Sequence, residues 1–80
     1  MNTVFIVYKT DVHHSYDSRY IIGVATSKRS AIEICKAQAQ KEGEHIDKED
    51  LQLLIDIQQT QGYAGEGEFH FEGMTTDTLL

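Results

Sequence analysis

Histidines and carboxylates gather in two places along the chain. In the first, His13 and His14 lie between Asp11 and Asp17, and imidazole and carboxylate groups are common metal ligands. Adjacent histidines on an extended segment point in opposite directions, so they do not converge on one ion. The pattern therefore favours a polar surface loop over a metal site.

The second gathering is a row of Glu68, His70 and Glu72 in a segment of strand-like sequence. Residues two apart share one face of a strand, so this row, with Glu66 nearby, could bind a cation or assist proton transfer. A charged row is also typical of the solvent-facing side of an edge strand, where it discourages aggregation. We favour the solvated strand face.

The single cysteine, Cys35, falls on the apolar side of a predicted helix, and no base near it in the sequence would activate its thiol. We predict that it is a buried apolar residue.

The glycine-rich segment 62–67 lacks the Gly-Lys-Ser/Thr sequence of a phosphate loop and precedes a strand rather than a helix. We therefore expect a protein without enzymatic activity, without a cofactor and without a bound metal.

Strands are predicted for 3–10, 20–26 and 67–75, because β-branched and aromatic residues concentrate there. The first strand is apolar on both sides at its centre, which is typical of a strand that is central in its sheet or covered on both faces. Gly23, inside the second strand, predicts a bulge or a close packing partner.

A helix is predicted for 27–42, with Ser27 or Ser30 as its N-cap and Gly43 at its C-terminus. Its apolar arc is formed by small and branched residues, namely Ala31, Ile32, Ile34, Cys35 and Ala39. Gln38 falls inside this arc. A glutamine in that position needs polar partners, so we expect it at the edge of the core or at an interface.

Segment 48–58 allows two interpretations. Asp47 supplies a helix N-cap followed by acidic residues, which suit the helix dipole. The apolar stripe of that helix would be Leu51, Leu54 and Ile55. A strand is the alternative, because every second residue of 51–57 is apolar. We favour the helix, since β-branched residues are few, and expect its additional apolar residues, Leu53 and Ile57, to be buried against a neighbour such as a second subunit.

These elements predict one α+β domain over residues 1–80, because 80 residues leave room for a single small core. The predicted architecture is a small three-stranded antiparallel sheet with two helices on one face, in the order ββααβ. If segment 48–58 were a strand, the order would be ββαββ.

Charge is distributed unevenly between the two halves of the chain. Residues 1–41 carry six cationic side chains and three carboxylates, a net of +3, whereas residues 42–80 carry Lys48 and ten carboxylates, a net of −9. The overall charge of −6 argues against nucleic-acid binding. We expect the halves to attract each other, within one domain or between two copies.

The N-terminal sequence, the length of the apolar stretches and the cysteine count bear on the cellular location of the protein. The N-terminal apolar run ends at Lys9, which makes it too short for a signal peptide. No stretch approaches the roughly 20 apolar residues that span a membrane. One cysteine cannot form an internal disulfide, which fits a reducing compartment. We therefore expect a cytoplasmic protein with no membrane partner.

Two stretches of the sequence carry a resemblance. The first is Val4-Phe-Ile-Val-Tyr-Lys-Thr-Asp11 followed by 14–18 and 22–27, and the second is 59–69 with Glu72 and 78–80. Together they resemble small proteins encoded by gut bacteria and by their phages or mobile elements, a group without an assigned function. The resemblance implies an accessory protein and no particular activity.

We expect a non-enzymatic protein-interaction module that self-associates. An alternative is an acidic phage or mobile-element accessory protein that inhibits a host nucleic-acid-binding protein. A small metal-binding protein or enzyme that uses His13, His14 or the row Glu68, His70 and Glu72 is less favoured. The candidate interaction surface comprises Gln38, Leu53, Ile57, Gln59, Thr60, Gln61, Tyr63, Glu66, Glu68, His70 and Glu72.

Overall fold

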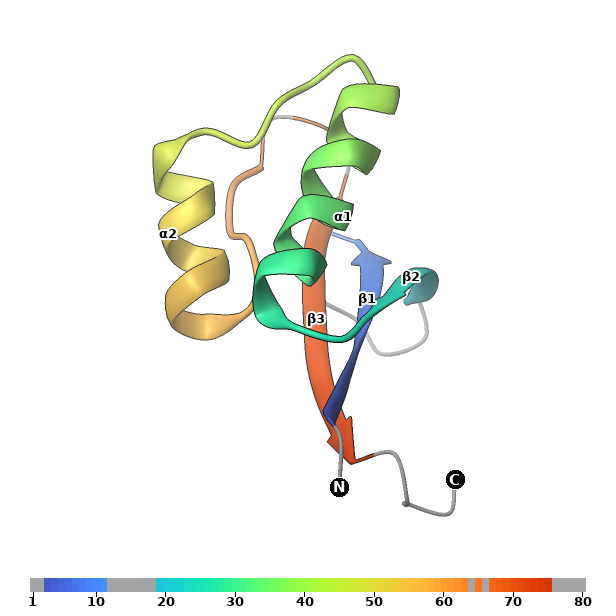
Figure 1. Ribbon diagram of the computed structural model, residues 1–80. Helices are drawn as coiled ribbons and strands as arrows, with labels where there is room; N and C mark the ends of the chain where they lie inside the picture. Colours follow the sequence, from blue (N-terminus) through green and yellow to red (C-terminus); the bar gives the residue numbers. More distant parts are fainter. Residues whose placement is uncertain (1–2, 12–18, 64, 66, 76–80) are drawn as a thin grey trace.

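The computed structural model describes residues 3–11, 19–63, 65 and 67–75 of the chain. The elements within these residues follow one another as β1 (Thr3–Thr10), β2 (Tyr20–Ala25), α1 (Lys28–Lys41), α2 (Lys48–Ile57) and β3 (Glu68–Thr75) (Figure 1). The predicted α+β fold in the order ββααβ is confirmed, and the alternative with a fourth strand is wrong. The predicted element ends agree with the observed ones to within one residue.

The sheet is antiparallel, with strand order β2-β1-β3. At its centre Val7 of β1 lies opposite Gly23 of β2 and Phe71 of β3. Of the two possibilities for the first strand, a central position in the sheet or cover on both faces, the structure shows the central position. Side chains alternate along β1, so Val7 points to one face of the sheet while Ile6 and Tyr8 point to the other.

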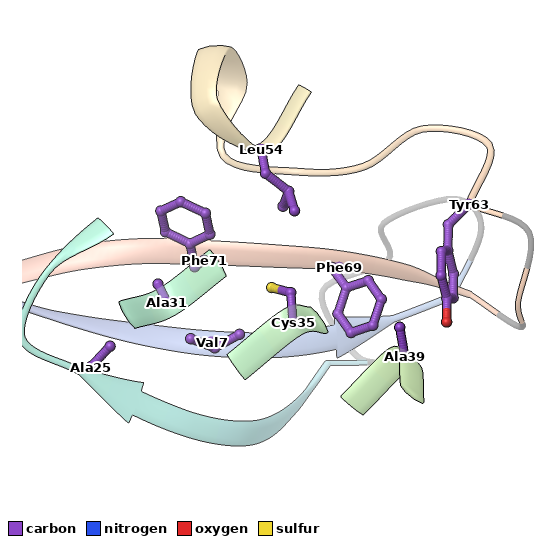
Figure 2. Close-up of a cluster of buried hydrophobic side chains, with 9 residues drawn as sticks. All are labelled: Val7, Ala25, Ala31, Cys35, Ala39, Leu54, Tyr63, Phe69 and Phe71. Carbon is purple, nitrogen blue, oxygen red and sulfur yellow. The ribbon is translucent and has the colours of Figure 1, made fainter. Parts of the chain in front are cut away.

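Both helices send side chains to the sheet face that carries Val7 (Figure 2). α1 contributes small residues at intervals of four, namely Ala31, Cys35 and Ala39, and α2 contributes Leu54. Short side chains let α1 approach the sheet closely, and the rings of Phe69 and Phe71 fill the space between sheet and helices. The prediction that Cys35 is buried is confirmed.

Capping residues define both ends of α1. Ser27 is the N-cap, and its hydroxyl accepts a 3.1 Å hydrogen bond from the Ser30 amide. At the C-terminus Gly43 adopts φ +79°, and the Glu44 amide donates to the Ala39 carbonyl at 2.9 Å. This pattern is a Schellman motif, which satisfies carbonyls that the helix leaves unpaired.

α2 begins where its cap predicts and presents less of its apolar surface to the core than expected. The Asp47 carboxylate accepts a 2.8 Å hydrogen bond from the Asp50 amide, and Gln58 ends the helix in the left-handed conformation at φ 61°. Of the expected stripe, Leu54 is fully buried, whereas Ile55 is 49% exposed. The helix meets the core along one narrow edge.

Gly23 lies at a β-bulge and also has a close packing partner, the two possibilities that its position in the strand indicated. A Cβ atom at this position would lie 2.9 Å from Cδ1 of Ile34, so the glycine lets α1 approach β2. The register also shifts here, since Val7 pairs with Gly23 but Tyr8 pairs with Ile21. Ile22 is the extra residue of a β-bulge, and its side chain packs against the core.

Candidate interaction surfaces

The carboxylate of Glu68 organises the loop that leads from α2 to β3. One of its oxygens accepts hydrogen bonds from the Thr60 hydroxyl at 2.6 Å and from the Tyr63 amide at 3.2 Å, and the other accepts from the Gly62 amide at 2.8 Å. Glu68 and Thr60 are both buried. A buried carboxylate needs such donors, so Glu68 holds the loop in place.

The same loop pairs with β3 along the edge that β1 leaves free. The Thr60 amide donates to the Phe69 carbonyl at 2.9 Å, and the Phe71 amide donates to the Gln58 carbonyl at 3.0 Å. Gln59 therefore lies beside β3 as an isolated bridge partner of His70. The first half of β3 is covered on both sides, so it does not have the open edge that its charged sequence suggested.

A buried lysine connects this loop to α1. The Lys9 ammonium lies 2.8 Å from Oε1 of Glu42, 4.4 Å from the ring centroid of Tyr63 and 4.2 Å from that of Phe69. The Tyr63 hydroxyl donates to the same glutamate oxygen at 3.0 Å. Ion pairing and cation–π contacts thus compensate the burial of a charge.

Gln38 completes this cluster, because its amide donates to the second Glu42 oxygen at 3.1 Å. The side chain lies at the edge of the core, with the polar partner that its position required. Burial alone would raise the pKa of Glu42, but hydrogen bonds from Lys9, Gln38 and Tyr63 outweigh it and lower the pKa. Burial and the Glu42 carboxylate raise the pKa of Tyr63 well above its ordinary value.

A second polar cluster joins β3 to the start of β2. Nη1 of Arg19 lies 2.7 Å from Oε1 of Glu72, and Nε2 of His70 lies 3.2 Å from the same oxygen. The Tyr8 ring stacks on His70 with centroids 6.1 Å apart, and the Arg19 guanidinium lies 5.2 Å from the Tyr8 centroid. Burial would raise the pKa of Glu72, but Arg19 and His70 together lower it.

The predicted row of Glu68, His70 and Glu72 is thus divided. His70 and Glu72 share a contact, while the carboxylate of Glu68 is held by the loop. Among the residues that the structure describes, no group of three or more histidine, cysteine or acidic side chains could hold a metal ion. His13, His14 and Glu66 lie outside those residues.

Cys35 lacks the surroundings of a nucleophile. Burial raises the pKa of its thiol to about 12, despite weaker opposing effects of a backbone hydrogen bond and of Lys9. A thiol with this pKa is protonated at neutral pH and reacts slowly. The residue serves packing between α1 and the sheet.

Among the residues that the structure describes, large apolar side chains are exposed in two regions. On β2, Tyr20 is 56% exposed and Ile21 and Val24 are each 60% exposed. On α2, Ile55 and Ile57 are 49% and 46% exposed. The β2 residues are the more exposed set, and exposed apolar residues that adjoin one another are typical of interaction sites.

Ile21 and Val24 lie on one face of the sheet. Ile21 pairs with Tyr8 and Val24 pairs with Ile6, and these β1 residues point away from the helices. Residues three positions apart in a regular strand point to opposite faces. Ile21 and Val24 share a face because the bulge at Ile22 interrupts the alternation. We call this face the open face. Its apolar residues are Val4, Ile6, Tyr8, Ile21 and Val24, and it also carries His70 and Glu72, which pair with Tyr8 and Ile6. Neither α1 nor α2 covers it.

The predicted interaction surface is distributed over several parts of the fold. Its buried members are Thr60, Tyr63 and Glu68, and its half-buried members are Gln38, Leu53, Gln59, His70 and Glu72. Ile57 and Gln61 are exposed, and Glu66 lies outside the described residues. Sequence reasoning missed Ile21 and Val24, because the sequence of 20–26 does not show which face of that strand the helices cover.

Helices and sheet thus define a small α+β domain whose sheet is covered by helices on one face. No protein-family model matches the chain, and no match was found among curated proteins or solved structures. No helix within the described ranges is long and apolar enough to cross a membrane. The exposed surfaces of the domain are therefore the basis for a functional proposal.

Proposed function

We propose that the protein is a non-enzymatic protein-interaction module that self-associates through the open face and its margin at β2. The observation that carries this proposal is the 60% exposure of both Ile21 and Val24, side by side on a sheet face that the helices leave bare. Covering apolar area contributes about 25 cal/mol per Å². Two adjoining branched side chains provide such area.

The polar clusters support an architectural rather than a catalytic role. Lys9 and Arg19 are each engaged by a carboxylate, and Glu68 accepts three hydrogen bonds from loop donors. These groups hold elements together, and their hydrogen bonds leave little capacity for a substrate. A cytoplasmic location accords with Cys35, the chain's only cysteine, being a buried free thiol.

The alternative role, an acidic inhibitor that mimics nucleic acid, receives less support. It requires the carboxylates of residues 42–80 to line one surface. Glu42 and Glu72 are paired with cations, and Asp50 and Glu68 are buried. The exposed acids of α2 and the segment before it are too few to imitate a phosphate backbone.

Self-association is favoured over a different acidic or basic partner by the lack of charge on β2. No residue from Tyr20 to Ala25 is charged, although the chain carries −6 overall. Two copies can therefore approach along β2 without placing like charges together. At Ile55 and Ile57, by contrast, Asp56 lies between the exposed side chains, and two copies would repel each other there.

Sedimentation equilibrium and light scattering over a range of salt test the proposal. We expect a mass of about twice 9.1 kDa that persists at high salt, because apolar contacts resist screening. Val24→Glu is expected to give a monomer. Ile57→Glu is the matched control, since it introduces the same charge at another exposed position, and should leave the dimer intact.

Two results would contradict the proposal. One is a monomer at every accessible concentration and salt condition. The other is the reverse pattern, in which Ile57→Glu separates the copies and Val24→Glu does not, because the interface would then lie on α2.

A further inference from the structure

The outer edge of β2 is the open edge of the sheet. β2 pairs with β1 on one side, and no backbone hydrogen bond within the described part of the chain reaches its other side. At the opposite margin of the sheet the loop pairs with β3 through Gln58 and Thr60. The loop covers the first half of β3, whereas within the described residues nothing pairs with the outer side of β2 along the whole of Tyr20–Ala25.

β2 lacks the side chains with which edge strands prevent pairing. Such strands usually carry a proline or an inward-pointing or exposed charge, and Tyr20–Ala25 contains neither. The bulge at Ile22 bends the strand. It also turns Ile21 and Val24 to one face, where they form a short apolar strip.

We infer that two copies pair their β2 strands antiparallel, with Ile21 of each copy opposite Val24 of the other. This inference rests on the proposed function and specifies its geometry. The pairing would extend each three-stranded sheet into one continuous sheet across both copies. Its two-fold axis makes the interface isologous, so each copy offers the same strand.

Side-chain sizes favour this register over its neighbours. Directly opposite residues of an antiparallel pair lie on the same face, so Ile21 and Val24 meet twice on the open face. On the other face the exposed ring of Tyr20 lies across from Ala25, a large side chain opposite a small one. Shifting the register by one residue would move the apolar strip out of alignment.

Cysteine cross-linking tests the register. In a Cys35→Ala background, Ile21→Cys and Val24→Cys proteins are prepared separately, mixed in equal amounts and oxidised mildly. We expect the mixture to form a disulfide-linked dimer at least several-fold faster than either protein alone. In either protein alone the two cysteines are offset by three residues, roughly 10 Å along the strands, which exceeds the span of a disulfide.

A mixture of Ile55→Cys and Ile57→Cys proteins, in the same background, measures cross-linking by random collision. Circular dichroism establishes that each variant is folded.

Hydrogen exchange of the unmodified protein supplies a measurement that needs no substitution. The β2 amides should become more protected as concentration rises, while those of α2 should not change.

The outcomes separate the inference from the proposed function. If the protein sedimented as a dimer but the mixture cross-linked no faster than the single variants, and β2 exchange did not depend on concentration, the copies would meet through another surface and the inferred β2 pairing would be wrong. If the protein sedimented as a monomer, both the self-association and the register would be wrong.

Discussion

Lys9 and Glu42 form an ion pair of 2.8 Å in which the lysine side chain is 5% exposed and the glutamate side chain 26% exposed. The pair joins the central strand to the C-terminal cap of α1. Arg19 and Glu72 form a similar pair between the two halves of the chain. The attraction between a basic first half and an acidic second half is thus realised within one domain.

The unequal burial of Lys9 and Glu42 predicts unequal effects of removing each partner. Glu42→Gln leaves the buried ammonium without its counter-charge, and we expect a loss of about 3 kcal/mol in the free energy of unfolding. Lys9→Met keeps the aliphatic stem and leaves a carboxylate that water reaches, so the loss should be smaller. Urea denaturation of both variants measures the difference, and a larger loss for Lys9→Met would contradict this account.

Acid should destabilise the protein through Glu42 and Glu72. Their pKa values are lower in the folded protein than the ordinary value of 4.5. The stabilisation is therefore present above about pH 4.5 and is lost as the pH falls through the lowered values. Asp50 opposes this trend, because burial and then Asp47 raise its pKa, so its protonation favours the folded state.

Urea midpoints measured from neutral pH down to about pH 3 test this expectation. The stability of the unmodified protein should decline in the acid range. The double variant Glu42→Gln and Glu72→Gln should be less stable at neutral pH and show a flatter acid decline. An equally steep decline in the double variant would assign the acid effect to other groups.

Glu68→Gln should destabilise the loop between α2 and β3. An amide keeps one acceptor oxygen and presents an NH2 group to donors of Thr60, Gly62 or Tyr63, so we expect a loss of about 1–3 kcal/mol. Glu72→Gln makes the same chemical change at a half-buried position and should cost less. A double-mutant cycle with Thr60→Val measures the coupling across the 2.6 Å hydrogen bond, and additive losses would show that the contact contributes little.

Two glycines with similar backbone angles should differ sharply in their tolerance of alanine. Gly43 and Gly67 adopt φ +79° and +76°. A Cβ atom at Gly43 meets nothing within 4 Å, so Gly43→Ala should cost only the left-handed strain of about 1 kcal/mol. At Gly67 the Cβ would collide with the Thr10 carbonyl oxygen. Thermal unfolding should rank Gly67→Ala as the far more damaging change, and equal losses would contradict this.

Local sequence was sufficient for the elements and for their order. The caps Ser27 and Asp47 and the glycine at 43 mark helix ends through contacts with residues only a few positions away. The cap at Asp47 correctly favoured a helix over the alternating strand pattern of 51–57. The burial of Cys35 followed from helical periodicity, which depends only on spacing along one element.

The interaction surface depended on contacts that local spacing does not specify. Glu68 looked like a member of a solvated row, yet donors from the loop bury its carboxylate. The sequence did not single out Ile21 and Val24, because alternation shows which residues share a face and not which face a helix covers. The helices cover the face of Val7, and the bulge at Ile22 leaves Ile21 and Val24 on the other. The burial of Glu68 and the exposure of Ile21 and Val24 are therefore decided by packing between elements that are distant in sequence.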